Sequence, residues 1–248
     1  MSGRRFIIHS RSIQDGSAAL EGELFRHIVR VLRLAAGDSL TLVDETGSEH
    51  DGVIEHVAKD LVTVRITRSN REPAPEGSGM RITVCQALPK GEKIDLILQK
   101  GTELGAHDFW LFGGSRSVAR VRHDQLDAKL ERWSRIVSEA ARQCGRRTVP
   151  RVQWYPSAAE AAAAAAHDLR LILWEGERSR RLKDALAGSP VPTSVIVSIG
   201  PEGGFDQRET DLFARHGFQS VSLGSRILRT ETAAIAIVSI LQYTGGDI

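Results

Sequence analysis

The order of hydrophobic and polar positions divides the chain into two parts of different character. In residues 1–73, short apolar or alternating runs predict strands at 4–9, 39–43, 52–57 and 61–67. Apolar residues at helical spacing predict one amphipathic helix over 23–33, whose other face carries Arg26, His27, Arg30 and Arg33. Short strands with a single helix are typical of a small β-barrel-like module.

From residue 81 onward, apolar strands alternate with helical stretches, which predicts an α/β fold with a mainly parallel sheet. Strands are expected at 81–88, 108–112, 169–174, 194–199 and 218–223, and helices near 90–104, 124–144, 157–167, 178–187, 206–216 and 231–243. The alanine run after Ser157 predicts an exposed helix. Asp206 followed by Glu209 predicts a helix start with a capping box, and Gly217 predicts the end of that helix.

A linker separates the two parts. Residues 69–80 contain two prolines, two glycines and no apolar periodicity, between two apolar strands. We therefore expect a first domain over 1–73, a linker over 74–80 and a second domain over 81–248.

The charge distribution changes what the net charge suggests. The 248 residues carry 33 Lys and Arg against 31 Asp and Glu, and a net charge of +2 gives no indication of a nucleic-acid partner. Residues 1–33 nevertheless have a net charge of +3, and residues 81–151 a net charge of +6. Of the basic residues 27 are arginine, which suits phosphate binding, although a solvated surface or the base composition of the genome would also explain them.

The sequence lacks the signals that are typical of several classes of protein. The start of the chain has no signal-peptide pattern, and the longest nearly apolar run, 232–241, falls short of the roughly 20 residues that span a bilayer. With two cysteines and eight dispersed histidines, we expect a cytoplasmic protein without a metal site. The sequence contains neither the dinucleotide-binding and P-loop glycine motifs nor the nucleophile elbow of the α/β-hydrolases.

Two loops that follow predicted strands contain the strongest candidate chemistry. In open α/β sheets ligands bind beyond the carboxyl ends of the strands. Residues 200–205 contain three glycines, which allow a ligand to approach the backbone, although a simple tight turn explains them as well. In the second loop Ile227 and Leu228 are apolar between arginines, which favours contact with an apolar ligand such as a purine, or anchoring of the loop to the core.

These loops resemble a known family. Ile199-Gly-Pro-Glu-Gly-Gly-Phe205 and Leu223-Gly-Ser-Arg-Ile-Leu-Arg-Thr-Glu-Thr-Ala233 are similar to the two signature segments of the RsmE-type rRNA uracil-N3 methyltransferases of the SPOUT (α/β trefoil-knot) superfamily. The resemblance covers nearly the whole chain. Further matching segments are His27-Ile-Val-Arg-Val-Leu-Arg-Leu34 with Gly37-Asp38, Gln86-Ala-Leu-Pro-Lys90, Lys100-Gly-Thr-Glu-Leu-Gly105, Arg116-Ser117 and Glu139-Ala-Ala-Arg-Gln143.

The resemblance implies a SPOUT trefoil-knot methyltransferase domain with an N-terminal PUA-like β-barrel domain. It also implies a homodimer that binds S-adenosylmethionine in a bent form and methylates N3 of a uridine in 16S rRNA or the small ribosomal subunit. By the matched positions, the cofactor would contact a set of residues in three loops: Leu173, Trp174, Glu175, Ile199, Gly200, Pro201, Gly203, Gly204, Leu223, Gly224, Ile227 and Leu228. The single asparagine, Asn70, lies in the linker region, which argues against the ribose methyltransferases of the same superfamily, because these use asparagine-rich motifs.

Methylation of uracil N3 requires loss of its proton. We expect a guanidinium, from Arg229 or Arg226, to stabilise the developing anion, and a carboxylate, from Glu202 or Glu231, to accept the proton. Glu202 could instead orient the glycine-rich loop, and Glu231 could favour the first turn of the last helix. We favour Arg229 as the anion stabiliser and leave the base open.

RNA binding is expected to depend on the two basic zones. The predicted RNA-binding residues are Arg4, Arg5, Arg30, Arg33, Arg116, Arg120 and Arg122. Three alternatives stay open: a non-catalytic ribosome-assembly factor of the same fold, a SPOUT methyltransferase that acts on another RNA, and a small-molecule enzyme that binds a nucleotide through the glycine-rich loop.

Overall fold

The computed structural model describes residues 5–44, 47–70, 79–187 and 191–245. The chain divides into two compact units. Unit 1 comprises Met1–Glu76 and Ala141–Val149, and unit 2 comprises Gly77–Ala140 and Pro150–Ile248.

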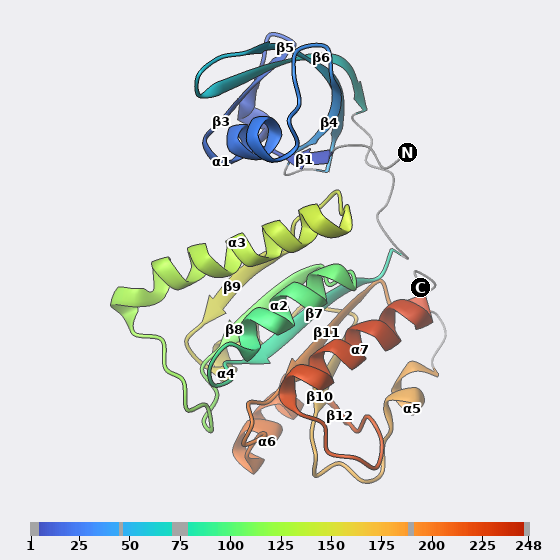
Figure 1. Cartoon of the computed structure of the whole chain (residues 1–248). Coiled ribbons are helices and arrows are strands. Elements are labelled where there is room, and N and C mark those ends of the chain that lie inside the picture. The colour runs from blue at the N-terminus through green and yellow to red at the C-terminus, as the bar shows by residue number, and fades with distance from the viewer. Residues whose placement is uncertain (1–4, 45–46, 71–78, 188–190, 246–248) are drawn as a thin grey trace. The chain divides into compact units, whose positions relative to one another are not determined.

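Unit 1 contains a six-stranded sheet in the order β1-β4-β5-β6-β3-β2 (Figure 1). Only the β1–β4 pair is parallel among its described pairs. The strands are β1 (Arg5–Ile7), β2 (Ile13–Gln14), β3 (Ser17–Glu21), β4 (Ser39–Val43), β5 (Glu49–Val57) and β6 (Leu61–Asn70). The four predicted strands are present, β4 with its predicted bounds and the other three with shifted ends, whereas β2 and β3 were not predicted. Strand β3 buries alternate residues, Ala18 and Leu20, but a small alanine contributes little to a hydrophobic pattern.

The helical segment of unit 1 differs in kind from the predicted helix. A short helix α1 (Gly22–Phe25) continues as a π-helix, Arg26–Val31, and the chain leaves it through Arg33, which has a φ of 54°. Phe25 and Ile28 are buried in the core of the barrel, as the predicted apolar face requires. Arg26, Arg30 and Arg33 are exposed.

Unit 2 contains a six-stranded parallel sheet in the order β12-β10-β11-β7-β8-β9. Its strands are β7 (Arg81–Ala87), β8 (Asp108–Phe112), β9 (Arg151–Tyr155), β10 (Leu169–Leu173), β11 (Ser194–Ile199) and β12 (Gln219–Val221). Its helices are α2 (Lys93–Glu103), α3 (Leu126–Cys144), α4 (Ala158–Ala164), α5 (Leu182–Leu186), α6 (Gln207–Arg215) and α7 (Thr230–Gly245). Helices α2 and α7 pack together on one face of the sheet, and α4 and α6 pack together on the other (Figure 1).

The predicted α/β alternation is confirmed, and strands 108–112 and 194–199 have the expected bounds. Strand β9 was not predicted. It is an edge strand that pairs only with β8 among the described strands, and none of its residues is fully buried. An edge strand of this kind needs no continuous apolar run, so its sequence signal is weak.

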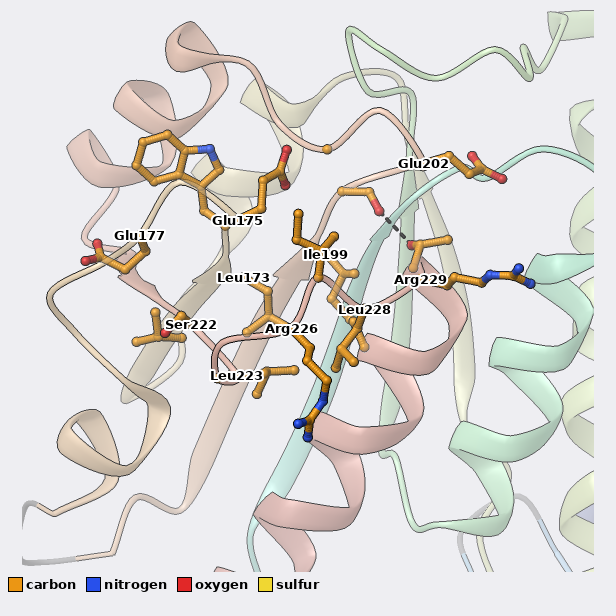
Figure 2. Close-up of a pocket in the computed structure, with 18 of the residues that line it drawn as sticks. Leu173, Glu175, Glu177, Ile199, Glu202, Ser222, Leu223, Arg226, Leu228 and Arg229 are labelled. Carbon is orange, nitrogen blue, oxygen red and sulfur yellow. Dashed lines mark hydrogen bonds between the residues drawn. The ribbon is translucent and has the colours of Figure 1, made fainter.

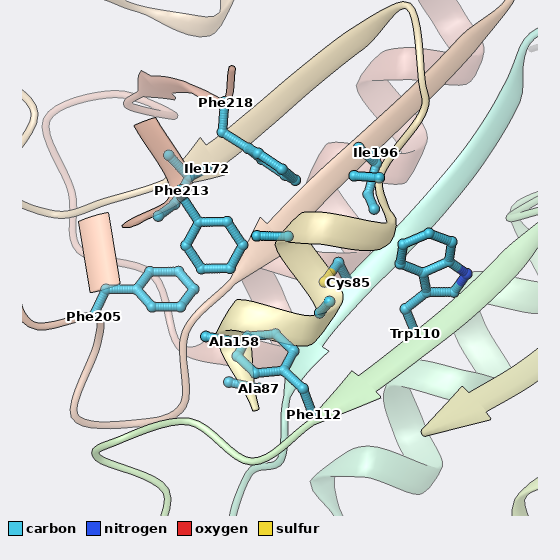
Figure 3. Close-up of a cluster of buried hydrophobic side chains, with 13 residues drawn as sticks. Cys85, Ala87, Trp110, Phe112, Ala158, Ile172, Ile196, Phe205, Phe213 and Phe218 are labelled. Atoms are coloured by element: carbon cyan, nitrogen blue, oxygen red, sulfur yellow. The ribbon is translucent and has the colours of Figure 1, made fainter. Parts of the chain in front are cut away.

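The alanine-rich helix α4 corrects the expectation of an exposed helix. Ala158, Ala161 and Ala162 are buried in a core cluster that also contains Phe205 and Phe213 (Figure 3). Small side chains let a helix backbone approach the sheet and the aromatic rings closely, so an alanine run can form core as well as surface.

No helix in the described part of the chain is long and apolar enough to cross a membrane.

Candidate functional site

Three loops begin side by side at the carboxyl edge of the parallel sheet. Leu173, the last residue of β10, is paired with Ile199 at the end of β11 and with Val221 at the end of β12. The loops after β10 and β12 are also joined by backbone hydrogen bonds, because Ser222 donates to the Arg180 carbonyl (3.0 Å) and accepts from Leu182 (3.0 Å). This edge is the usual position for a ligand in an open α/β sheet.

The three loops surround a cavity of about 580 Å³ (Figure 2). This volume suits a small organic ligand. Every residue predicted to bind the cofactor lines this cavity: Leu173, Trp174, Glu175, Ile199, Gly200, Pro201, Gly203, Gly204, Leu223, Gly224, Ile227 and Leu228. Figure 2 shows that Leu173, Ile199, Leu223 and Leu228 form its apolar wall. The Ile227 side chain is 83% exposed, so it lines the open side of the cavity rather than anchoring the loop.

The glycine-rich loop after β11 folds tightly back on itself. The Gly204 N–H donates to the Pro201 carbonyl (2.9 Å), and Gly204 has a φ of +63°. A Cβ at Gly200 would lie 3.0 Å from the carbonyl carbon of Gly204, and a Cβ at Gly204 would collide with the Glu175 carboxylate. The positive φ favours glycine at 204, the close backbone favours it at 200, and the backbone itself forms this wall of the cavity.

After this turn, buried Phe205 anchors the loop in the aromatic cluster, and α6 begins. The Asp206 carboxylate accepts from the Glu209 N–H (2.8 Å), and Glu209 accepts from the Asp206 N–H (3.3 Å), which confirms the predicted capping box. Gly217, with a φ of +79°, follows the end of this helix as predicted.

Gln86 is a buried glutamine that is hydrogen-bonded to residues lining the cavity, and it was not among the predicted site residues. The Gln86 side-chain amide at the end of β7 donates to the Ala87 carbonyl (2.8 Å) and to the Thr230 hydroxyl (2.9 Å). The Thr230 hydroxyl in turn donates to the Gly200 carbonyl (2.7 Å). A polar residue near the carboxyl end of a strand was the available signal.

Glu177 was also not among the predicted site residues. It lines the cavity with Lys93 and Arg178. Its carboxylate accepts hydrogen bonds from the Ser179 hydroxyl (2.6 Å) and from the backbone N–H groups of Ser179 and Arg180. These bonds lower the pKa of Glu177 to about 2, so it is a negative charge at the cavity at neutral pH.

Of the four residues predicted to be catalytic, Arg226, Arg229 and Glu202 line the cavity. Both arginines are exposed, and Figure 2 shows their side chains pointing in different directions. Glu231 lies in the first turn of α7 and is not among the described residues that line the cavity.

The Glu202 carboxylate accepts hydrogen bonds from α2 and from the turn that precedes α2. It accepts from the ammonium of Lys93 (2.6 Å) and from the N–H of Lys90 (3.1 Å). Partial burial raises the pKa of Glu202, but the hydrogen bonds outweigh it and the net pKa is lowered. A carboxylate with a lowered pKa is a weaker proton acceptor, and these contacts attach the glycine-rich loop to α2.

The predicted RNA-binding residues fall into two groups. Arg30, Arg33, Arg120 and Arg122 are exposed, and only Arg122 has an ion-pair partner within the described residues, Asp124 at 3.4 Å. Arg4 lies outside the described residues.

The other two arginines are held by protein groups. Arg5 pairs with Glu49 at 2.7 Å and donates to the Gly145 carbonyl (3.3 Å). Arg116 donates to the Gly203 carbonyl (2.9 Å). Among the described residues, no group of three or more His, Cys, Asp or Glu side chains could hold a metal ion.

Comparison with known proteins identifies the two parts of the chain. Residues 76–242 match the family model of an RNA methyltransferase domain, and residues 20–67 match that of an RNA methyltransferase PUA domain. The chain is 33% identical over 233 residues to ribosomal RNA small subunit methyltransferase E of Bacillus subtilis, covering 91% of this chain and 89% of the relative. It is 33% identical over 225 residues to the protein of the same name from Mycobacterium tuberculosis, with coverage of 88% and 82%.

Solved structures agree with these sequence matches. A methyltransferase E from Neisseria gonorrhoeae bound to S-adenosylmethionine superposes with a TM-score of 0.84, at 29% identity and 97% coverage of both chains. A Legionella pneumophila protein described as a methyltransferase in complex with SAM superposes with a TM-score of 0.86, at 33% identity and 98% coverage of both chains.

The parallel sheet, the cavity at its carboxyl edge and the two domain matches define an RNA methyltransferase with an N-terminal PUA-like domain. Within that class, the chain belongs to the ribosomal RNA small subunit methyltransferase E family. The predicted family and the predicted α/β fold of SPOUT type with a PUA-like first domain are confirmed.

Proposed function

We propose that the protein transfers a methyl group from S-adenosylmethionine to N3 of one uridine in the 16S rRNA of the small ribosomal subunit. The observation that carries this proposal is the cavity, because all twelve positions matched to the family's cofactor segments line it. Relatives that share the length of the chain are named for small-subunit rRNA methylation, and two similar structures contain the cofactor.

The cavity residues fit S-adenosylmethionine. Leu173, Ile199 and Leu228 offer apolar surface to an adenine ring, and the backbone at Gly200 and Gly204 permits close approach because a Cβ has no room there. The permanent charge of Glu177 complements a ligand that carries positive charge. When bound, S-adenosylmethionine supplies a methyl group on a positively charged sulfur as the electrophile.

The chain's own contribution to catalysis is positioning and charge. Uracil N3 attacks only after its proton is lost, so a cation beside the ring oxygens makes the reaction easier. We assign this role to Arg229, which is exposed and lines the cavity, with Arg226 as the alternative. Glu202 and Glu231 were the predicted proton acceptors. Because Lys93 and Lys90 already engage Glu202, and because Glu231 does not line the cavity, we propose that the proton leaves to water.

We propose that residues 1–73 guide the RNA, that 74–80 link the domains, and that 81–248 form the knotted catalytic domain. The exposed arginines Arg30, Arg33, Arg120 and Arg122, together with Arg4, would contact phosphates. Arg5 and Arg116 would do so only with the donors that their protein contacts leave free. A ribosomal substrate implies a cytoplasmic location.

We also propose a homodimer. Helix α7 exposes Ile240 (38%) and Tyr243 (75%), and a second cavity of about 500 Å³ lies between α5 and α7. Exposed apolar surface of this kind favours a protein interface. Light scattering should give twice the chain mass for the wild type and the monomer mass for Ile240→Asp. A monomeric wild type would contradict the proposal.

One experiment tests the proposed function directly. The protein is incubated with S-adenosylmethionine and either small subunits or naked 16S rRNA from a strain that lacks the modification, and the rRNA is mapped by mass spectrometry. We expect a single uridine to gain one base methyl, and Arg229→Ala to abolish most of the signal. Methylation only of another RNA would indicate a different substrate, and RNA binding without any transfer would indicate an assembly factor.

A further inference from the structure

The loop that follows β8 is docked onto the glycine-rich loop of the cofactor cavity. The Arg116 guanidinium donates to the Gly203 carbonyl (2.9 Å), and Gly203 lines the cavity. The contact is also steric, since a Cβ at Gly203 would lie 3.2 Å from Cβ and 3.5 Å from Cδ of Arg116. The arginine stem therefore covers the outer side of the loop whose inner side faces the cavity.

The residues on either side of Arg116 are fixed to the same part of the fold. Ser115 donates from its backbone N–H to Glu209 (2.9 Å) and from its hydroxyl to Glu209 (2.7 Å) and to Asp206 (3.2 Å). These two carboxylates form the capping box that begins α6 directly after the glycine-rich loop. Ser117 is buried and its hydroxyl accepts from the N–H of Gly114 (3.2 Å). Arg116 is therefore presented to Gly203 by an ordered turn.

The geometry contrasts with that of the neighbouring arginine. Arg120 lies four residues further along the same loop; both arginines are exposed, but Arg120 has no ion-pair partner in the described ranges. Arg116 uses a charged donor on a backbone carbonyl, and such hydrogen bonds are among the stronger ones because one partner is ionised. One loop thus carries one arginine engaged with the cofactor loop and one that is open to a polyanion.

We propose that Arg116 is a positioning residue for cofactor binding: it holds the Gly203 carbonyl and thereby keeps the glycine-rich loop in the shape that receives S-adenosylmethionine. This inference rests on the proposed function for the identity of the ligand. It assigns to Arg116 a role that differs from the phosphate contact expected of a basic loop residue.

Calorimetric titration of the apo protein with S-adenosylmethionine, without RNA, tests the inference. Arg116→Met keeps the apolar stem and removes the donor, so its dissociation constant should rise by about tenfold. Arg116→Lys, which retains a charged donor, should recover most of the affinity. Arg215→Met, which removes an exposed arginine from the last turn of α6, is the matched control and should bind like the wild type.

Steady-state kinetics provide the readout that a general structural defect would not give. At saturating S-adenosylmethionine, Arg116→Met should retain its kcat within about threefold while the KM for the cofactor rises by about tenfold. Its affinity for 16S rRNA should stay within about threefold of the wild type. The midpoint for thermal unfolding of apo Arg116→Met should lie within about 3 °C of the wild type, whereas the upward shift of the midpoint on adding S-adenosylmethionine should be smaller for Arg116→Met.

Two results would overturn the inference. One is an unchanged cofactor affinity in Arg116→Met, whether or not RNA binding falls. The other is an equal fall of kcat and stability in Arg116→Met and Arg116→Lys, which would assign the residue to folding alone. A wild-type protein that does not bind S-adenosylmethionine would contradict the proposed function itself, so the two failures are distinguishable.

Discussion

Gln86 and Thr230, separated by 144 positions in the sequence, are joined by a hydrogen bond of 2.9 Å from the side-chain amide to the hydroxyl. Thr230 begins the last helix, Gln86 is the last residue but one of a central strand, and the Thr230 hydroxyl donates to the Gly200 carbonyl. The pair therefore links three segments at the carboxyl edge of the sheet. Because both residues are buried, the hydrogen bond between them lies away from water, where it is electrostatically stronger.

Replacing Gln86 should weaken both the fold and the site. Gln86→Met has similar volume but no donor, so the Thr230 hydroxyl loses a buried partner at a cost of about 1–3 kcal/mol. We expect a lower free energy of unfolding in denaturant titrations and a weaker affinity for S-adenosylmethionine. Gln99→Met, on the exposed side of α2, should change neither quantity. If Gln86→Met matched the wild type in both measurements, the linking role would be wrong.

Replacing Arg229 should affect the chemical step and not cofactor binding. If its guanidinium stabilises the uracil anion, Arg229→Ala should lower the single-turnover methylation rate by about a hundredfold. The affinity for S-adenosylmethionine should stay within about threefold, because the apolar residues and glycines that we assign to the cofactor remain in place. The same pair of measurements on Arg226→Ala decides between the two arginines. A normal rate in Arg229→Ala with a reduced rate in Arg226→Ala would transfer the role to Arg226.

The loop after β10 should gain stability from Glu177 in a defined pH range. The folded pKa of about 2 lies below the ordinary value of 4.5, so the folded state favours the ionised form. The stabilisation is therefore complete above about pH 4.5 and is lost as the pH falls toward about 2. The difference in unfolding free energy between wild type and Glu177→Gln should be constant near neutral pH and shrink below pH 4.5.

Ser179→Ala provides the matched variant for this prediction. It removes the hydroxyl that is the largest cause of the lowered pKa of Glu177. The stabilisation should then be smaller, and its loss, which still begins near pH 4.5, should be complete at a higher pH than in the wild type. A difference between wild type and Glu177→Gln that does not change with pH would contradict the assignment.

Binding of rRNA should depend on salt through the exposed arginines of the first domain. Each phosphate contact that is removed should lower the slope of log affinity against log salt by about one. Arg30→Gln and Arg33→Gln should each weaken binding and flatten this slope in fluorescence anisotropy titrations with 16S rRNA. Arg65→Gln is the control, because Arg65 is already paired with Glu55 at 2.7 Å. An affinity that does not vary with salt would exclude phosphate contacts as its main source.

Local features of the fold followed from the sequence because their causes lie within a few residues. The strand at 194–199, the capping box of Asp206 and Glu209, and the glycine at 217 obey rules of periodicity, capping and backbone conformation. The burial of α4 did not follow, because an alanine run is compatible with surface or core. What lies beside it depends on Phe205 and Phe213, which come more than 40 residues later.

The candidate site likewise has features that the sequence predicts and features that it does not. Its cavity-lining residues could be predicted because the matched segments contain them and the strands place their ends together. The roles of Gln86 and Arg116 could not, because each depends on a group that is distant in the sequence. Glu177 is bound by its near neighbours Ser179 and Arg180, so what required the tertiary structure was its position at the cavity. The lowered pKa of Glu202 has the same origin, since Lys93 is 109 positions away.

By itself the sequence determined the two domains' character, the parallel α/β class, the family and the loops that line the cavity. Only the tertiary structure decided which charged side chains have hydrogen-bond or ion-pair partners that are distant in the sequence. Hydrophobic periodicity and turn preferences depend on a few neighbouring residues. The long-range hydrogen bonds and the electrostatic field at a carboxylate such as Glu202 depend instead on how distant strands are packed.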